Sequence, residues 1–161
     1  MTAAHPSRAW LLGVVAGGLL ASCSGSKEGP RRFRYAEAVE VPAAVTERDQ
    51  LAALLAGYAY RNGLAFRDSS PRTQRVSNGR KTLDFTIQRP LTNGRLWTEM
   101  EVSAVGNEEV LITFAAPLDQ GIKADADQGR AEIVSELKMH WPDTAEVELL
   151  PDGGLPSKWR R

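Results

Sequence analysis

Residues 82–104 read TLDFTIQRPLTNGRLWTEMEVSA, and apolar and polar residues alternate along them on either side of a turn. A period of two residues indicates β-strands with one buried and one solvated face. In the first strand the apolar set is Leu83, Phe85 and Ile87. In the second strand one face would carry Leu96, Thr98, Met100, Val102 and Ala104, which are expected to be buried. The other, solvated face would carry Trp97, Glu99, Glu101 and Ser103. Because Pro90 and Asn93-Gly94 separate the strands, we expect an antiparallel pair joined by a tight turn.

Further strands are expected on both sides of this pair. Residues 110–116 follow the Gly106-Asn107 turn and extend the antiparallel meander. Shorter candidates are residues 33–41, where Glu37 interrupts the alternation, residues 64–67 and residues 146–150. Residues 68–74, which contain Pro71 among polar and charged residues, are expected to form a loop, and Asn78-Gly79 is typical of a hairpin turn.

Two segments have the spacing of amphipathic helices. The first covers residues 46–63, with Thr46 as its expected N-cap and Asn62-Gly63 as its stop. The second covers residues 126–141, with Asp125 as the expected cap and Pro142 after the last turn. Their apolar faces contain Leu51, Leu54, Leu55 and Tyr58 in the first and Ile133, Val134, Leu137 and Trp141 in the second.

These elements predict an α+β fold. A two-layer sandwich buries all the apolar faces when two amphipathic helices lie on one face of an antiparallel sheet of about four to six strands. Residues 33–161 are long enough for one domain with its own core, and they end in a basic tail.

The N-terminus has the features of an export signal. Arg8 precedes an apolar run, residues 9–20, which is shorter than the ~20 residues of a membrane-spanning helix. The run ends in Leu20-Ala21-Ser22-Cys23, which contains the only cysteine of the chain. This segment resembles the lipobox of a bacterial lipoprotein. A plain secretory signal ahead of a free thiol, or an N-terminal membrane anchor, are the alternatives.

The resemblance implies that cleavage falls between Ser22 and Cys23 and that lipid is attached to Cys23. Residues 1–22 are then a signal peptide and residues 23–32 a lipidated tether, which reaches at most ~35 Å when extended. In lipoproteins the residue after the cysteine often directs sorting, and Ser24 implies the outer membrane, facing the periplasm, in a Gram-negative cell. An exported chain with one cysteine forms no internal disulfide, which agrees with this use of Cys23.

The charge of the chain gives no reason to expect nucleic acid as a partner. Removing Arg8 with the signal leaves 19 of the 20 Lys and Arg residues against 20 Asp and Glu, and binding to nucleic acid favours a basic excess. Basic clusters occur at residues 31–34 and 158–161. Such runs are usually solvated, and their functional use would be contact with anionic headgroups or an acidic partner.

Few residues could support catalysis or hold a metal. After the signal only His140 remains as a histidine, and its position beside the apolar stripe favours a packed or boundary side chain. Zinc needs several Cys or His ligands, so we expect no zinc site and no cofactor beyond the lipid. Asp125, Asp127 and Glu136 match only part of a calcium-binding loop, because Gly129 and Arg130 stand at its fifth and sixth positions.

Partner contacts are expected on the polar face of the sheet and in the tail. Trp97 would be an aromatic anchor beside Glu99 and Glu101, unless the loop of residues 68–75 or the tail covers it. The tail contributes Lys158, Trp159, Arg160 and Arg161, which could contact a protein or an anionic membrane surface.

The sequence therefore favours a non-enzymatic, membrane-anchored envelope lipoprotein. Its domain would bind a protein or envelope component as an assembly, accessory or immunity factor. The alternative is a small cell-wall glycan hydrolase, which needs two carboxylates in one cleft, drawn from Glu99, Glu101, Asp125 and Asp127.

Overall fold

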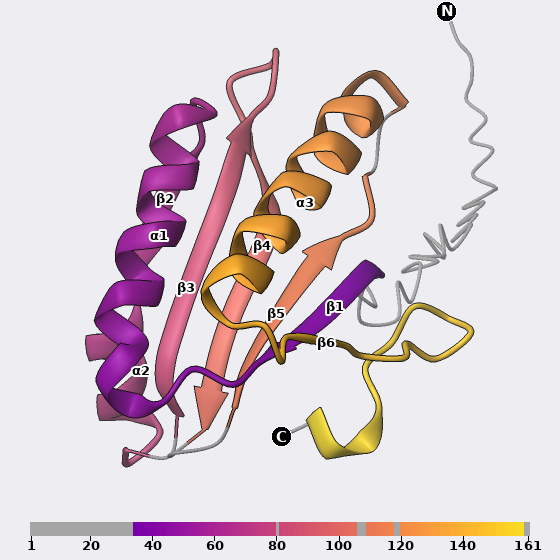
Figure 1. Cartoon of the computed structure of the whole chain (residues 1–161). Coiled ribbons are helices and arrows are strands. Elements are labelled where there is room, and N and C mark those ends of the chain that lie inside the picture. The colour runs from indigo at the N-terminus through magenta and orange to yellow at the C-terminus, as the bar shows by residue number, and fades with distance from the viewer. Residues whose placement is uncertain (1–33, 80, 106–108, 118–119, 160–161) are drawn as a thin grey trace, which may run out of the picture. The chain divides into compact units, whose positions relative to one another are not determined.

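The computed structural model describes residues 34–79, 81–105, 109–117 and 120–159. Within these ranges six strands form one sheet in the order β2-β3-β4-β5-β1-β6, and every neighbouring pair is antiparallel (Figure 1). The strands are β1 (Tyr35–Val41), β2 (Ala65–Asp68), β3 (Lys81–Pro90), β4 (Leu96–Val105), β5 (Val110–Ala115) and β6 (Ala145–Glu146). The predicted α+β class and antiparallel sheet are confirmed.

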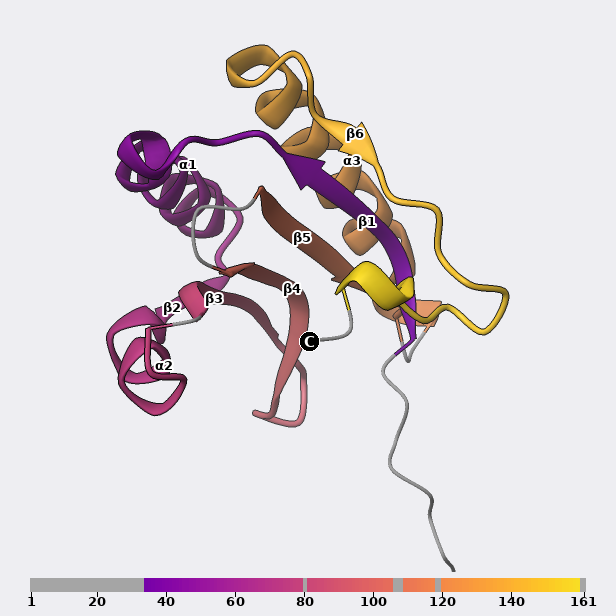
Figure 2. The same ribbon diagram turned by 90° about the horizontal axis from the view of Figure 1, so that it is seen from below.

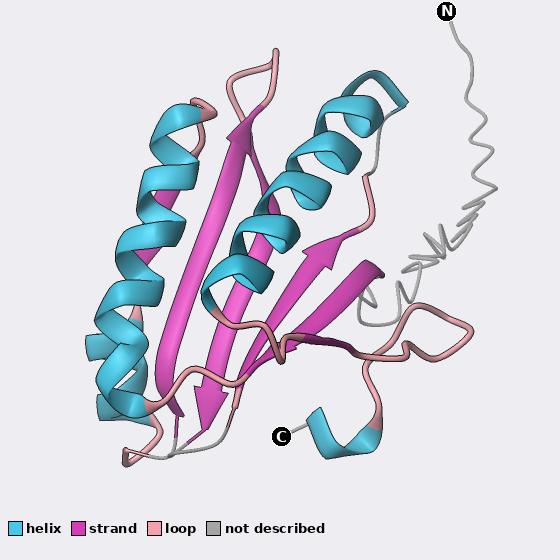
Figure 3. Cartoon of the chain, in the orientation of Figure 1, coloured by secondary structure: helices cyan, strands magenta, loops and turns pink. Residues whose placement is uncertain are grey.

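Two long helices cover one face of this sheet, as predicted. They are α1 (Arg48–Arg61) and α3 (Gln120–His140), which lie in front of the strands in Figures 1 and 3. A short helix, α2 (Ser70–Val76), and two 3₁₀ turns, η1 (Val45–Glu47) and η2 (Ser157–Trp159), complete the described elements. The face of the sheet opposite α1 and α3 is called the open face below, and η2 lies on its side of the sheet (Figure 2).

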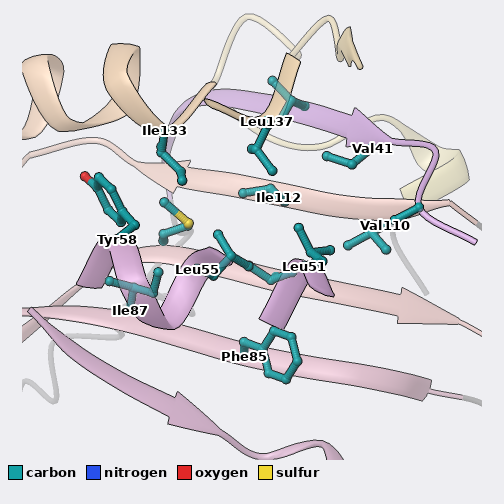
Figure 4. Close-up of a cluster of buried hydrophobic side chains, with 14 of the residues drawn as sticks. Val41, Leu51, Leu55, Tyr58, Phe85, Ile87, Val110, Ile112, Ile133 and Leu137 are labelled. Atoms are coloured by element: carbon teal, nitrogen blue, oxygen red, sulfur yellow. The ribbon is translucent and has the colours of Figure 1, made fainter. Parts of the chain in front are cut away.

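The core lies between the sheet and the two long helices. Leu51 and Leu55 of α1 and Leu137 of α3 are fully buried against the central strands (Figure 4). The strands contribute Val41, Phe85, Ile87, Val110 and Ile112 among others. Burying one such aliphatic side chain stabilises the fold by roughly 1.5–3 kcal/mol, so the apolar spacing seen in the sequence accounts for the two-layer arrangement.

The interruption at Glu37 corresponds to an irregularity in β1. Its register against β5 shifts between Tyr35 and Glu37, so the alternation is displaced by one position there. Beyond the shift the pairing is regular from Glu37↔Phe114 to Val41↔Val110. A β-bulge of this kind moves the following side chains to the other face, which explains the break in the pattern.

Both predicted helix starts are wrong. The first helix begins at Arg48 after the η1 turn, and the Glu47 carboxylate accepts a hydrogen bond from the Ala44 amide at 2.8 Å. The second begins at Gln120, so Asp125 lies inside it and does not cap it. Its early turns bury Ala126 and Gly129, small residues that contribute little to an apolar periodicity.

The polar loop predicted at residues 68–74 is largely helical. Helix α2 has Pro71 in its first turn, and the Asp68 carboxylate accepts a hydrogen bond from the Ser70 amide at 2.8 Å. Asn78 and Gly79 have positive φ angles but do not form a hairpin, because Gly79 donates to the Gln74 carbonyl and closes α2. Seven residues are too few to show a helical period.

The strand predicted at residues 146–150 is shorter than expected. Only Ala145 and Glu146 pair with β1 as β6, and the Val147 amide donates one further bond to the Ala38 carbonyl. The Leu150 amide then bonds the Gly154 carbonyl at 2.8 Å, so a turn ends the pairing. Across the described ranges, no helix is both long enough and apolar enough to cross a membrane.

Candidate binding sites on the two faces of the sheet

A bulge in β4 changes which face its first residues occupy. Ile87 pairs with Met100, whereas Gln88 pairs with Thr98, so Glu99 is an extra residue without a partner in β3. From Met100 to Ala104 the faces are as predicted. Before the bulge, the side chains of β4 point to the opposite face from the one predicted. Trp97 therefore lies opposite Arg89, on the side of the sheet that carries α1 and α3.

The predicted exposure of Trp97 and Glu99 is therefore wrong. Trp97 is 8% exposed and Glu99 is 4% exposed. The strand register places Trp97 on the side of the sheet that the helices cover. Its burial therefore does not require the segment of residues 68–75 or the tail, which were expected to cover it. Neither side chain can serve as an anchor on the open face.

Glu99 forms a two-point ion pair with Arg89. The distances are 2.5 Å from Arg89 Nε to Glu99 Oε2 and 3.1 Å from Nη2 to Oε1. The hydrogen bond to Glu99 raises the pKa of Arg89, although burial acts in the opposite direction. The guanidinium therefore stays charged, and the pair satisfies two groups that would be costly to bury alone.

Tyr58 of α1 and Gly129 of α3 meet beside this ion pair. The Tyr58 hydroxyl occupies the space that a side chain at Gly129 would need, and Glu99 Oε1 lies 3.5 Å from the same point. The hydroxyl is buried and has no hydrogen-bond partner among the described residues. Burial is the main cause that raises the pKa of Tyr58, and the negative charges of Glu99 and Glu132 add to it.

A polar cavity of about 240 Å³ opens next to these groups, between the C-terminal end of α1 and α3. It is called the interhelical cavity below. Its lining consists of Asn62, Arg89, Asp125, Gln128, Gly129 and Glu132. The Asn62 amide nitrogen donates to the Tyr58 carbonyl at 3.0 Å, which leaves its side-chain oxygen as an acceptor.

The open face carries a second hollow of about 180 Å³, called the open-face groove. It is lined by Tyr35, Asp84, Thr86, Glu101, Val102, Ser103, Leu111, Thr113, Leu155 and Trp159. The Tyr35 hydroxyl donates to Glu101 Oε2 at 3.4 Å, and burial, with Glu101 next, raises the pKa of Tyr35. Trp159 from the tail thus stands on the face where Trp97 was expected.

The tail folds back onto the domain as far as the structure describes it. Lys158 Nζ lies 2.8 Å from Glu40 Oε2 and 4.8 Å from the centre of the Trp159 ring. The hydrogen bond to Glu40 raises the pKa of Lys158. A cavity of about 540 Å³ separates this turn from residues 146–151. Arg160 and Arg161, as well as Ser22 and Cys23, lie outside the described residues.

The acids named for catalysis or calcium lie in several places. Glu101 is on the open face and Asp127 pairs with Lys123 and Arg130, whereas Asp125 lines the interhelical cavity beside the Arg89–Glu99 pair. The remaining acid of the calcium pattern, Glu136, pairs with Arg61 at 2.7 Å. Within the described ranges no cluster of three or more metal-binding side chains occurs.

His140 is exposed, so its predicted packed or boundary position is wrong. It is the last residue of α3, and its ring centre lies 5.8 Å from that of Trp141.

Comparisons with protein-family models, curated proteins and solved structures found no match to the chain.

Proposed function

We propose that the chain is a lipid-anchored, non-enzymatic protein of the bacterial envelope that binds a partner protein through the open face of its domain. Cys23 would carry the lipid, and residues 24–32 would tether the domain at the outer membrane. The Leu20-Ala21-Ser22-Cys23 segment supports the lipid anchor. It carries no information about the partner.

The open-face groove is the observation that carries the binding proposal. It combines the aromatic rings of Tyr35 and Trp159 with the Glu101 carboxylate on a face that α1 and α3 leave uncovered. Aromatic side chains surrounded by polar groups are typical of contact anchors in protein interfaces. Lys158 extends the same surface with a basic group, which is held beside the ring by Glu40.

The hydrolase alternative gains no support from the groove. A glycosidase needs two carboxylates at a defined separation in one cleft. Of the four acids named for it, only Glu101 lines the open-face groove. Asp125 lines the interhelical cavity beside Glu99, whose carboxylate is already bound by the Arg89 guanidinium. The alternative stays a prediction.

The anchor is tested by following the processing of the full chain in cells. Globomycin, which blocks cleavage of lipoprotein signals, should cause the precursor to accumulate. Cys23→Ala should abolish lipid labelling and release the protein from the membrane fraction. Normal processing and membrane association in both experiments would contradict the anchor.

The binding face is tested by site-specific photo-crosslinking in the same cells. A crosslinker at Ser103 lies in the open-face groove, and one at Ser135 is exposed on α3 as the matched control. Ser103 should give a discrete adduct that disappears with Trp159→Ala, and Ser135 should give none. An adduct from Ser135 alone, or one from Ser103 that survives Trp159→Ala, would refute the assignment to this face.

A further inference from the structure

Trp159 of the η2 turn lines two hollows, the open-face groove and the cavity of about 540 Å³ between η2 and residues 146–151. On the side of that cavity, Lys158 Nζ lies 4.8 Å from the centre of the Trp159 ring and 2.8 Å from Glu40 Oε2. An aromatic ring and a carboxylate together attract a cation. The chain therefore shows within itself how a basic side chain is held beside Trp159.

The open-face groove has matching groups but no cation. Its described lining contains the rings of Tyr35 and Trp159 and the carboxylates of Asp84 and Glu101, and it contains no Lys, Arg or His residue. The nearby Lys158 lines the other cavity and is already paired there. The groove is therefore a negatively charged hollow with two aromatic rings.

Glu101 is the carboxylate that an incoming cation would meet. It has no ion pair among the residues that the structure describes. The Tyr35 hydroxyl reaches Glu101 Oε2 at 3.4 Å, which is long for a hydrogen bond between two oxygens. Burial, followed by the negative charge of Glu101, raises the pKa of Tyr35, as expected beside an uncompensated carboxylate. Asp84, in contrast, already accepts a hydrogen bond from the Thr73 hydroxyl at 2.5 Å.

On the basis of the proposed binding role of the open face, we infer that the partner protein inserts an arginine side chain into this groove. A guanidinium is flat, stacks on aromatic rings and presents paired N–H donors to a carboxylate. Tyr35 and Trp159 supply the rings, and Glu101 supplies the acceptor. The contact repeats, between two proteins, the arrangement that holds Lys158 within the chain.

The experiment titrates the full-length protein in a neutral detergent with a blocked glycyl-arginyl-glycine peptide and records two-dimensional NMR spectra. The matched control is glycyl-citrullyl-glycine, in which a neutral urea group replaces the guanidinium. At constant ionic strength, the arginine peptide should shift the Trp159 indole resonance and the amides of residues 101–103 and 111–113 in a saturable way. Absence of saturable shifts, saturable shifts elsewhere alone, or equal affinity for both peptides would overturn the inference.

Glu101→Gln assigns the effect to the groove. The amide keeps the shape of the side chain and an acceptor for Tyr35, but it removes the charge. Binding of the arginine peptide should weaken by about tenfold, since a hydrogen bond to a charged group is worth roughly that factor. Glu132→Gln removes the same charge from an exposed position on α3 and should leave the affinity unchanged. Equal weakening in the two variants would reduce the effect to overall charge and overturn the site.

Trp159→Leu tests the aromatic ring separately from the carboxylate. Leucine keeps an apolar side chain but has no aromatic face, so the affinity for the arginine peptide should fall by about two- to fivefold. An unchanged affinity would overturn the contact. Deleting residues 160–161 should leave the affinity the same. A tenfold gain on deletion would show that the chain's own arginines take this place, and it would overturn the assignment to a partner.

The Ser103 crosslink in cells separates this inference from the proposed function. Glu101→Gln should weaken the Ser103 adduct, whereas Glu132→Gln should leave it unchanged. A Trp159-dependent adduct that Glu101→Gln does not weaken would keep the binding face and overturn the arginine. Absence of any adduct would contradict the binding face itself, and the peptide titration would still decide whether the groove selects a guanidinium.

Discussion

The two ends of the layer between the sheet and the long helices are filled in different ways. At one end Val41, Leu51 and Val110 pack as aliphatic side chains, whereas the other end holds Tyr58 and the Arg89–Glu99 pair. Burial of apolar area alone stabilises the first end. A buried ion pair seldom stabilises a fold more than a well-packed apolar cluster of the same volume. The polar end is therefore the place where the chain departs from what stability favours.

The largest effect is expected for Trp97→Ala at the polar end. Because the indole is 8% exposed, its removal should lower the free energy of unfolding by about 3–5 kcal/mol. Urea unfolding followed by circular dichroism measures this change. Trp159→Ala, which removes a half-buried indole on the open face, is the control and should cost about 1 kcal/mol. Equal losses in the two variants would contradict the exchange of faces at the bulge.

Glu99→Ala tests the buried ion pair and should have the second-largest effect. It leaves the Arg89 guanidinium without its partner, and we expect a loss of about 2–3 kcal/mol, since the partial exposure of Arg89 reduces the usual penalty. Glu101→Ala removes a carboxylate on the open face of the sheet and should lower the free energy of unfolding by less than about 1 kcal/mol. Urea unfolding of both variants measures the two losses. A larger loss for Glu101→Ala would show that the two faces had been assigned the wrong way round.

Gly129→Ala tests the close approach of α3 to Tyr58. The new methyl group would occupy the place of the Tyr58 hydroxyl, so we expect a loss of about 1–3 kcal/mol, typical of an overpacked core. In the Tyr58→Phe background the next-nearest atom of the ring, Cζ, lies 3.7 Å from that methyl position. The loss should then fall below about 1 kcal/mol, and an undiminished loss in the double variant would contradict the proposed cause.

The elements with a long regular period could be predicted from the sequence. The β3–β4–β5 meander and the buried faces of α1 and α3 follow from side chains such as Phe85, Val102 and Leu137, whose burial outweighs local preferences. Short elements could not be predicted in the same way. Helix α2 spans 7 residues and depends on the Ser70 and Thr73 contacts with Asp84, which are 11 or more residues distant along the chain.

The polar site was missed because one extra residue exchanges the faces of a strand. Strict alternation places Glu99 on the same side as Glu101, and only the pairing of Gln88 with Thr98 reveals the bulge. Two features of the sequence could have indicated the polar site. Arg89 is a charged residue that follows Ile87 on the apolar side of β3. The small residues Ala126 and Gly129 allow a close approach between α3 and Tyr58. The open-face groove contains Glu101 and Trp159, both of which were predicted as contact residues.

Tyr58→Phe is expected to have the smallest effect on stability at neutral pH. Removing an unpaired buried hydroxyl should change the free energy of unfolding by only a few tenths of a kcal/mol, or increase it, because no hydrogen bond is lost. At alkaline pH the two proteins should differ. Burial raises the pKa of Tyr58 above the ordinary value of 10.0, so above that pH the unfolded chain loses its proton while the folded chain retains it.

The stability contributed by a raised pKa is fully present below the ordinary value and is lost as the pH rises toward the folded value. The wild-type protein should therefore lose up to about 1.4 kcal/mol per pH unit above about pH 10, and Tyr58→Phe should lose clearly less. Tyr60→Phe is the matched control, because Tyr60 lies on the same helix and is 88% exposed. Urea unfolding at about pH 8 and about pH 11 measures the difference. If Tyr60→Phe reduces the alkaline loss as much as Tyr58→Phe does, the buried hydroxyl is not its source, and the polar end of the layer carries no special sensitivity to pH.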